Sequence, residues 1–225
     1  MTCIIGYIDK KNNLWMGADS CGSDSSSKVI RKDTKLFNKG DFLIGYTSSF
    51  RIGQLLRFKW VQPEQSKSKG EYEFMCSDVI DSIRKCLKDN GYITVKNNVE
   101  EIGEFLVGYK NRLYKISTDL QVGESINNFG SCGYEDALAL DAIEKLDRII
   151  YGNKNLNFNV DIGGFLVTTK DNHDIIGSIS FEMIKELKPL YNSDDICKLV
   201  LKIASKFAVG VEEPFIIKKY LGDKK

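Results

Sequence analysis

Short apolar runs alternate with polar turn residues along the first fifty positions of the chain. The apolar runs cover residues 3 to 8, 14 to 18 and 41 to 46. Runs of this length, bounded by turn residues, are typical of β-strands. We therefore expect an antiparallel sheet here, with a hairpin at residues 10 to 13 and a surface loop at residues 20 to 27.

Later segments carry apolar residues at helical spacing. This spacing predicts helices near residues 75 to 90, 134 to 150 and 194 to 207. Gly91 follows the first of them, and Ser193 and Gly210 flank the last, as capping residues do. The first helix is expected to lie flat on the sheet.

A second group of strands is predicted between and after these helices. Residues 104 to 109 and 112 to 117 have the pattern of a hairpin joined by Lys110 and Asn111. Further strands are predicted at residues 164 to 169, 175 to 178 and 214 to 220. The order of strands, helices, strands, helices and strands predicts an α+β fold in which helices flank two sheets.

Length and composition favour one domain over residues 1 to 225. Of the 225 residues, 42% are hydrophobic, which is enough to close a substantial core. Residues 62 to 73 are polar, but they are too few to separate two independent domains.

The charge balance excludes some classes of partner. Lysine and arginine together number 32 and the acidic residues 31, so there is no positive excess to attract nucleic acid or anionic membranes. No apolar run approaches the roughly 20 residues that span a bilayer, and the start of the chain does not resemble a signal peptide. We expect a cytoplasmic protein.

Cysteine and histidine usage narrows the chemistry. The single histidine, His173, lies in a polar run at residues 170 to 174 that reads as a turn, which disfavours a histidine base or a His-rich metal site. Six cysteines have no Cys-x-x-Cys spacing and are predicted to be reduced core thiols: Cys3, Cys21, Cys76, Cys86, Cys132 and Cys197. We expect neither a metal nor an organic cofactor.

Thr2 is a candidate nucleophile. Methionine is normally removed before a residue as small as threonine, and the new α-amine would have a pKa of about 7.7 to 8.0. Such an amine acts as a base near neutral pH, so a threonine that carries it needs no histidine. Because threonine also occurs at position 2 by chance, this hypothesis needs support from other residues.

Asp19 and Lys35 supply that support. Each alone reads as an ordinary surface charge. Together with Thr2, in the runs Gly17-Ala18-Asp19-Ser20 and Arg31-Lys32-Asp33-Thr34-Lys35, they resemble the catalytic subunits of proteasomes and the HslV-like, proteasome-like peptidases of bacteria or phages. The resemblance implies an N-terminal nucleophile (Ntn) hydrolase with a four-layer αββα sandwich. The lysine would favour the deprotonated hydroxyl and lower the pKa of the α-amine, and the aspartate would hold the lysine.

Two further segments resemble parts of the same site. Phe129-Gly130-Ser131-Cys132-Gly133 resembles the family's Gly-Ser-Gly turn, which makes Ser131 a candidate to hydrogen-bond the α-amine; a helix cap is the alternative. Residues 42 to 51 resemble the junction whose backbone N–H forms the oxyanion hole. Ser48 or Ser49 stands there in place of glycine, so a serine must adopt the required backbone conformation.

The final third of the chain departs from the family. Lys206 stands roughly where a helper aspartate is expected. The resemblance implies a threonine-type endopeptidase that forms a homo-oligomeric ring, cleaves unfolded proteins or peptides and is activated by methionine removal without a propeptide. It leaves open an ATP-dependent unfoldase as a partner. Two alternatives are a catalytically inactive structural subunit of such a ring and an Ntn amidohydrolase that acts on a small amide.

Overall fold

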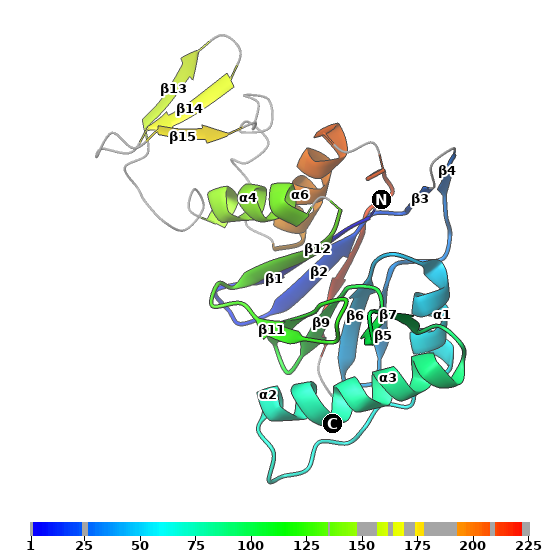
Figure 1. The fold of residues 1–225 in the computed structure, drawn as a ribbon. Helices are drawn as coiled ribbons and strands as arrows, with labels where there is room; N and C mark the ends of the chain where they lie inside the picture. Colours follow the sequence, from blue (N-terminus) through cyan, green and yellow to red (C-terminus); the bar gives the residue numbers. More distant parts are fainter. Residues whose placement is uncertain are drawn as a thin grey trace.

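The computed structural model describes residues 2–23, 27–134, 136–147, 157–161, 164–168, 174–177, 193–207 and 210–221. Two antiparallel sheets lie at its centre (Figure 1). The first has the order β12-β1-β2-β16, formed by Phe129–Gly133, Cys3–Ile8, Leu14–Ala18 and Ile216–Lys219. The second has the order β11-β10-β9-β6-β5, formed by Val122–Glu124, Arg112–Ile116, Phe105–Tyr109, Phe42–Tyr46 and Leu36–Lys39.

Helices cover the outer face of each sheet (Figure 1). Helices α4 and α6, at Asp136–Asp147 and Ser193–Phe207, pack on the first sheet. The second sheet is covered by α1, α2, a π-helical segment and α3, at Phe50–Phe58, Glu71–Phe74, Met75–Val79 and Ile80–Asp89. The layers run helix, sheet, sheet, helix, so the predicted α+β sandwich is confirmed.

Buried apolar side chains fill the three spaces between these layers. In β1, Ile4 faces the second sheet, while Cys3 and Ile5 face α4 and α6. In β6, Leu43 faces the first sheet, while Ile44 faces the helices on the other side. Because both faces of these strands are buried, their sequences are continuous apolar runs rather than alternating patterns.

Three smaller sheets complete the secondary structure of the described residues. They pair β3 with β4 (Cys21–Ser23 and Lys28–Ile30), β7 with β8 (Thr94–Lys96 and Val99–Glu101), and β13, β14 and β15 (Asn157–Asp161, Gly164–Thr168 and Asp174–Gly177). The first pair corrects the loop predicted at residues 20 to 27. Cys21 to Ser23 form a strand there because their hydrogen bonds come from β4, a partner that local composition does not reveal.

Most predicted elements are confirmed within a residue or two. The hairpin around Lys110 and Asn111 is present, with both residues at positive φ (47° and 58°), as two-residue hairpin turns require. The helix predicted from residue 75 instead begins at Glu71, inside the polar stretch of residues 62 to 73, whose composition hid its start. The turn predicted around His173 lies outside the described residues. The prediction of one domain over residues 1 to 225 stays a prediction.

Two other predictions are corrected by tertiary contacts. Residues 129 to 133 form strand β12, paired with β1, rather than a turn. Their glycines resemble turn residues locally, but the long-range ladder to β1 holds the segment extended. All six cysteines are free, and four of them are buried; Cys76 is exposed, so its assignment to the core was wrong.

Candidate active site

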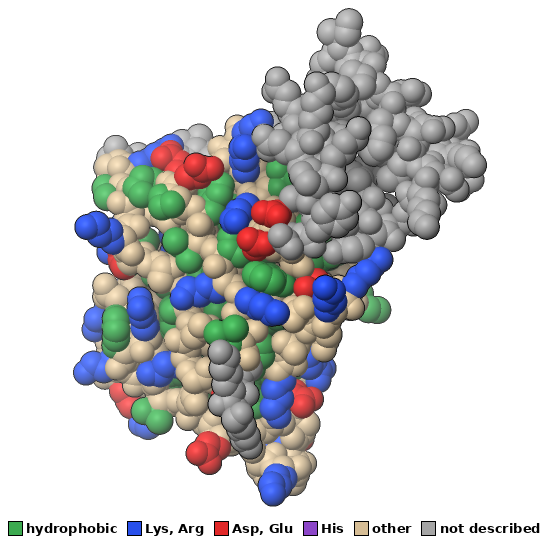
Figure 2. Space-filling view, turned by 180° about the vertical axis from the view of Figure 1, so that it is seen from behind, with side chains coloured by type: hydrophobic (Ala, Val, Ile, Leu, Met, Phe, Trp, Pro, Cys, Tyr) green, Lys and Arg blue, Asp and Glu red, His purple; other side chains and the backbone are tan. Residues whose placement is uncertain are grey.

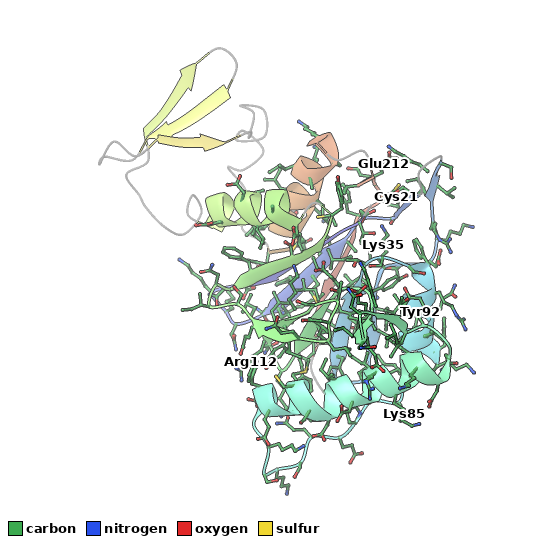
Figure 3. The ribbon with its side chains drawn as sticks, in the orientation of Figure 1. Cys21, Lys35, Lys85, Tyr92, Arg112 and Glu212 are labelled. Carbon is green, nitrogen blue, oxygen red and sulfur yellow. The ribbon has the colours of Figure 1, made fainter. Side chains whose placement is uncertain are left out.

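Thr2, Asp19 and Lys35 meet at one end of the sandwich. The Lys35 Nζ atom lies 3.0 Å from Thr2 Oγ1 and 2.8 Å from Asp19 Oδ2. Lys35 also donates to the main-chain carbonyl of Cys21. Figure 3 labels Lys35 and Cys21 together, near the point where Figure 1 marks the N-terminus. The three side chains thus lie together, as the sequence interpretation expected. Their catalytic roles stay a prediction.

The Asp19–Lys35 ion pair is buried. The exposed fraction of the side chain is 0% for Asp19 and 2% for Lys35. Burial raises the pKa of the Asp19 carboxyl, and the Lys35 ammonium and two main-chain N–H groups act against that rise. Removal of either partner would leave an uncompensated charge in the interior, which costs roughly 3 to 5 kcal/mol.

Local backbone geometry places Asp19 in this position. Asp19 directly follows β2, and its carboxylate accepts hydrogen bonds from the N–H groups of Cys3 and Cys21, each at 2.9 Å. The first bond ties the end of β2 to the residue next to Thr2. Lys35 directly precedes β5 and reaches the same point from the second sheet. The site is thus assembled where the ends of the two sheets meet.

The main chain of Thr2 is held by the segment after β12. The Tyr134 N–H donates to the Thr2 carbonyl at 3.1 Å. Gly133 has a φ of 114°, and a Cβ atom there would lie 2.1 Å from the Thr2 carbonyl oxygen. Only glycine permits both the conformation and the close approach.

Ser48 adopts the conformation that the sequence interpretation associated with glycine. Its φ is 71°, in the left-handed region, and it precedes Ser49, the N-cap of α1. The Ser49 N–H donates to the Thr47 carbonyl at 2.9 Å, and the Ser49 hydroxyl caps α1 by accepting from the Arg51 N–H. Ser49 is thus engaged within its own loop, so Ser48 is the better candidate for the oxyanion donor.

Ser131 and Lys206 are placed differently from the three central residues. Ser131 is buried, and its hydroxyl donates to the Asp136 carbonyl at 2.9 Å, at the start of α4. The predicted bond from Ser131 to the α-amine stays a prediction. Lys206 is exposed in the last turn of α6. It is not among the described residues that line the two cavities beside Thr2.

Two cavities adjoin Thr2, and the sequence interpretation missed the residues that distinguish them. The first, of about 260 Å³, is lined by Arg31, Phe50 and the start of the β3–β4 hairpin. The second, of about 350 Å³, is lined by Glu104, Thr118 and Tyr134. Thr2 and Ser48 line both. We call these the Arg31 cavity and the Glu104 cavity.

Glu104 connects three parts of the site. Its main-chain carbonyl accepts from the Thr47 N–H at 3.0 Å, and its carboxylate accepts from the Gly133 N–H at 3.3 Å. Lys115 lies behind it, 3.7 Å from Glu104 Oε1 and 2.9 Å from Asp136 Oδ2. Burial acts against the charge of Lys115, but the two carboxylates outweigh burial and raise its pKa. No sequence motif had marked Glu104.

A larger cavity, of about 470 Å³, lies along α6 beside Pro214 and Phe215. Its described lining contains no hydroxyl or thiol nucleophile, so we place the candidate active site at Thr2. Among the residues that the structure describes, no cluster of three or more acidic, histidine or cysteine side chains is arranged to hold a metal ion.

The surface fits the balanced charge of the chain. On the described part of the face in Figure 2, basic and acidic side chains are intermixed, with apolar side chains between them. In the part of the chain that is described, no helix has both the length and the apolar character needed to cross a membrane.

The sequence matches no known family model and no curated protein. Its fold, however, matches solved structures over nearly their whole length. BPH from Thiobacillus denitrificans matches with 15% identity and a TM-score of 0.65 over 100% of both chains. A complex of that protein with epoxomicin gives 13% identity and a TM-score of 0.66, covering 96% of this chain and 97% of that one.

HslV from Trypanosoma brucei gives 13% identity and a TM-score of 0.56, covering 96% of this chain and 98% of that one. At these identities the likeness concerns the fold. The chain therefore has the proteasome-like fold that the resemblance implied.

Proposed function

We propose that this chain, which has the fold of BPH and HslV, is a threonine-type endopeptidase subunit whose nucleophile is the Thr2 hydroxyl. The observation that carries the proposal is the 3.0 Å contact between Lys35 Nζ and Thr2 Oγ1, made by a lysine that is buried and paired with Asp19. A buried ion pair is costly to maintain. Its position against a hydroxyl group is explained if the lysine activates that hydroxyl.

In the proposed reaction, Thr2 is the first residue of the mature chain and carries a free α-amine. The Thr2 Oγ atom attacks a peptide carbonyl carbon, and its proton passes to the α-amine, directly or through a water. The Ser48 N–H stabilises the oxyanion that forms. The Lys35 ammonium favours the alkoxide and, by like-charge repulsion, keeps the amine in its neutral, basic form.

The second half of the reaction restores the enzyme. The protonated α-amine gives its proton to the leaving nitrogen, the carbon–nitrogen bond breaks, and an ester to Thr2 remains. Water then attacks the ester carbonyl and releases the acid, and the Thr2 hydroxyl regains its proton. Ser131 is proposed to hold the amine. No metal or organic cofactor takes part in this scheme.

The proposal includes the assembly and location. We infer a homo-oligomeric ring in the cytoplasm, acting on unfolded proteins or peptides, with the active site facing an enclosed chamber. An ATP-dependent unfoldase would be its partner for folded substrates.

The proposal is tested by intact mass and by hydrolysis of a fluorogenic peptide. We expect the active protein to begin at Thr2, and Thr2→Ala to lower kcat/KM by about a thousandfold or more because the nucleophile is lost. The matched control is Thr94→Ala, at an exposed threonine on β7. Epoxomicin, which is bound in one BPH structure, is expected to inhibit the wild type.

Each alternative has its own outcome in this experiment. Protein that begins at Thr2 but hydrolyses no peptide and no small amide would point to an inactive structural subunit. Hydrolysis of a small amide without peptide cleavage would point to an amidohydrolase. Full activity of Thr2→Ala would refute the nucleophile.

A further inference from the structure

Among their described lining residues, the two cavities that adjoin Thr2 carry charged side chains of opposite sign. Among the described residues that line the Arg31 cavity, Arg31 is the single charged one. Among those that line the Glu104 cavity, Glu104 is the single charged one. Thr2 and Ser48 belong to both walls, so the cavities meet at the candidate nucleophile and oxyanion donor. A peptide bound across Thr2 would present one side chain to each cavity.

Arg31 contacts two neighbouring side chains, Phe50 and Asp33. Its guanidinium carbon lies 3.9 Å from the centroid of the Phe50 ring, and its Nε and Nη2 atoms each lie 2.7 Å from an oxygen of Asp33. Asp33 does not line the cavity, so its counter-charge lies outside the lining. Nη1 takes no part in the hydrogen bonds to Asp33, and a carboxylate that reached it would accept from it.

Glu104 has a matching arrangement in its own cavity. Its carboxylate is fixed by the Gly133 N–H, and its partner Lys115 is absent from the described lining. The Glu104 side chain is 27% exposed, so it is accessible from the cavity. The other described lining residues there are uncharged, so a lysine or arginine side chain would meet one carboxylate and no cationic side chain among them.

The volumes are suited to single side chains. Cavities of about 260 and 350 Å³ hold several waters at roughly 30 Å³ each, and thus one extended polar side chain. In such a partly enclosed space, complementary charge favours binding and like charge opposes it. The cavities would therefore select substrates by charge on each side of the reacting carbonyl.

We propose that the preferred substrates are peptides with an acidic side chain on one side of the cleaved bond and a basic side chain on the other. The acidic side chain enters the Arg31 cavity and the basic one the Glu104 cavity. This inference rests on the proposed function, because it takes Thr2 as the point of cleavage.

The test compares three fluorescence-quenched peptides that differ only in one central pair: Glu-Lys, Lys-Glu and Gln-Gln. We expect one charged order to be cleaved within the pair about tenfold or more faster than Gln-Gln in kcat/KM, and the reverse order to be cleaved more slowly than Gln-Gln. Fragment masses identify the bond and hence which cavity takes the acyl side. Equal rates for the three peptides, or for the two charged orders, would overturn the proposal.

Variants assign each half of the preference to its cavity. Two further peptides keep the preferred order and replace either its lysine or its glutamate by glutamine. Arg31→Gln should abolish the advantage over Gln-Gln of the peptide that keeps glutamate and leave that of the peptide that keeps lysine; Glu104→Gln should do the reverse. Arg51→Gln and Glu73→Gln, at exposed positions outside both linings, are the matched controls. Asp33→Asn keeps Arg31 and should retain or increase the glutamate preference. If a control variant acted like its counterpart in a cavity, the effect would not come from the cavities.

Binding separates this proposal from the proposed function. The affinities of the three peptides for Thr2→Ala are measured by fluorescence anisotropy, with the same rank order expected. Suppose that the wild type cleaves none of the peptides, yet one charged peptide binds more tightly than Gln-Gln and the other more weakly. The peptidase function then fails and the charge selection stands. If the wild type cleaves all three peptides at similar rates, the charge selection alone fails.

Discussion

At the scale of single residues, the candidate site depends on one buried cation. Lys35 contacts Thr2, Asp19 and the Cys21 carbonyl, and it reaches them from a different sheet than the other two side chains. A single substitution of Lys35 would therefore change two contributions at once. It would activate the nucleophile, and it compensates the buried carboxylate of Asp19.

Lys35→Ala is expected to lower kcat/KM by about 100-fold or more, because a positioned charge that acts in the transition state is lost. It also leaves Asp19 unpaired, so some loss of stability is expected. The double variant Asp19→Asn/Lys35→Met removes both charges. It should fold and, like Lys35→Ala, have little activity. Lys85→Ala is the control, since Lys85 is exposed on α3, on the far side of the sandwich (Figure 3).

The measurement is steady-state peptide hydrolysis alongside circular dichroism and gel filtration. Near wild-type turnover by the folded double variant would show that the buried pair has no part in catalysis. Asp19→Asn alone should cost less activity than Lys35→Ala, since the one carbonyl oxygen of asparagine can retain one of the two hydrogen bonds from the Cys3 and Cys21 N–H groups.

At the scale of elements, strand ends and turns carry the site. The carbonyl of Thr2 is held by the segment that follows β12, and Ser48 turns the chain from β6 into α1. At the other end of β1, the turn before β2 is tied to a helix. Asp9 accepts from the Asn13 main chain, the Trp15 indole and the Ser193 hydroxyl at the start of α6.

Gly133→Ala is expected to displace Thr2, because the new Cβ atom would lie 2.1 Å from the Thr2 carbonyl oxygen and the backbone has a φ of 114°. We expect a loss of activity of about tenfold or more, with a fall in stability of roughly 1 to 3 kcal/mol. Gly70→Ala is the control, since nothing lies within 4 Å of a Cβ there. Peptide hydrolysis and urea denaturation measure the two effects, and unchanged values for Gly133→Ala would contradict the geometry.

Asp9→Ala is expected to destabilise the protein in a pH-dependent way. Burial opposes ionisation of Asp9, but hydrogen bonds from Asn13, Ser193 and Trp15 outweigh it and lower its pKa to about 2. A carboxyl with a lowered folded-state pKa stabilises the protein above its unfolded value of about 3.9 and loses that contribution as the pH falls towards 2.

The free energy of unfolding, measured with urea, should therefore fall by roughly 1 to 3 kcal/mol in Asp9→Ala at pH 7, and by less near pH 2.5. The exposed Glu64→Ala serves as the control. A difference between wild type and Asp9→Ala that stayed constant across this range would show that Asp9 acts through packing rather than through its charge.

At the scale of the whole molecule, the proteasome-like fold brings a strand start, a strand end and a loop from two sheets to one edge. Both cavities adjoin Thr2 and Ser48 at that edge. A nucleophile at an accessible edge would cleave other unfolded proteins that carry a suitable site, so confinement in an assembly is part of the proposed function.

The protein is therefore expected to form a closed ring or a stack of rings, with a mass that is a multiple of 25.4 kDa. Light scattering coupled to gel filtration measures it at micromolar concentration. A monomer mass with undiminished peptidase activity would contradict the assembly, and with it the enclosed chamber.

The sequence by itself determined the strands with two buried faces, the amphipathic helices and the candidates Thr2, Asp19 and Lys35. The strands and helices follow from local signals, namely apolar runs and helical spacing, whereas the three candidates rest on the resemblance of their runs to proteasome subunits. It misassigned residues 129 to 133 and part of the loop at residues 20 to 27, because their extended shape comes from strands far away in the chain.

Only the tertiary structure decided which side chains face Thr2. Arg31 and Glu104 carry no motif, and each is paired with a counter-charge, so either reads as an ordinary surface residue in the sequence. The charge that each presents to a substrate depends on whether its counter-charge also lines the cavity. That distinction is set by the packing of the two sheets, whose long-range contacts no local pattern encodes.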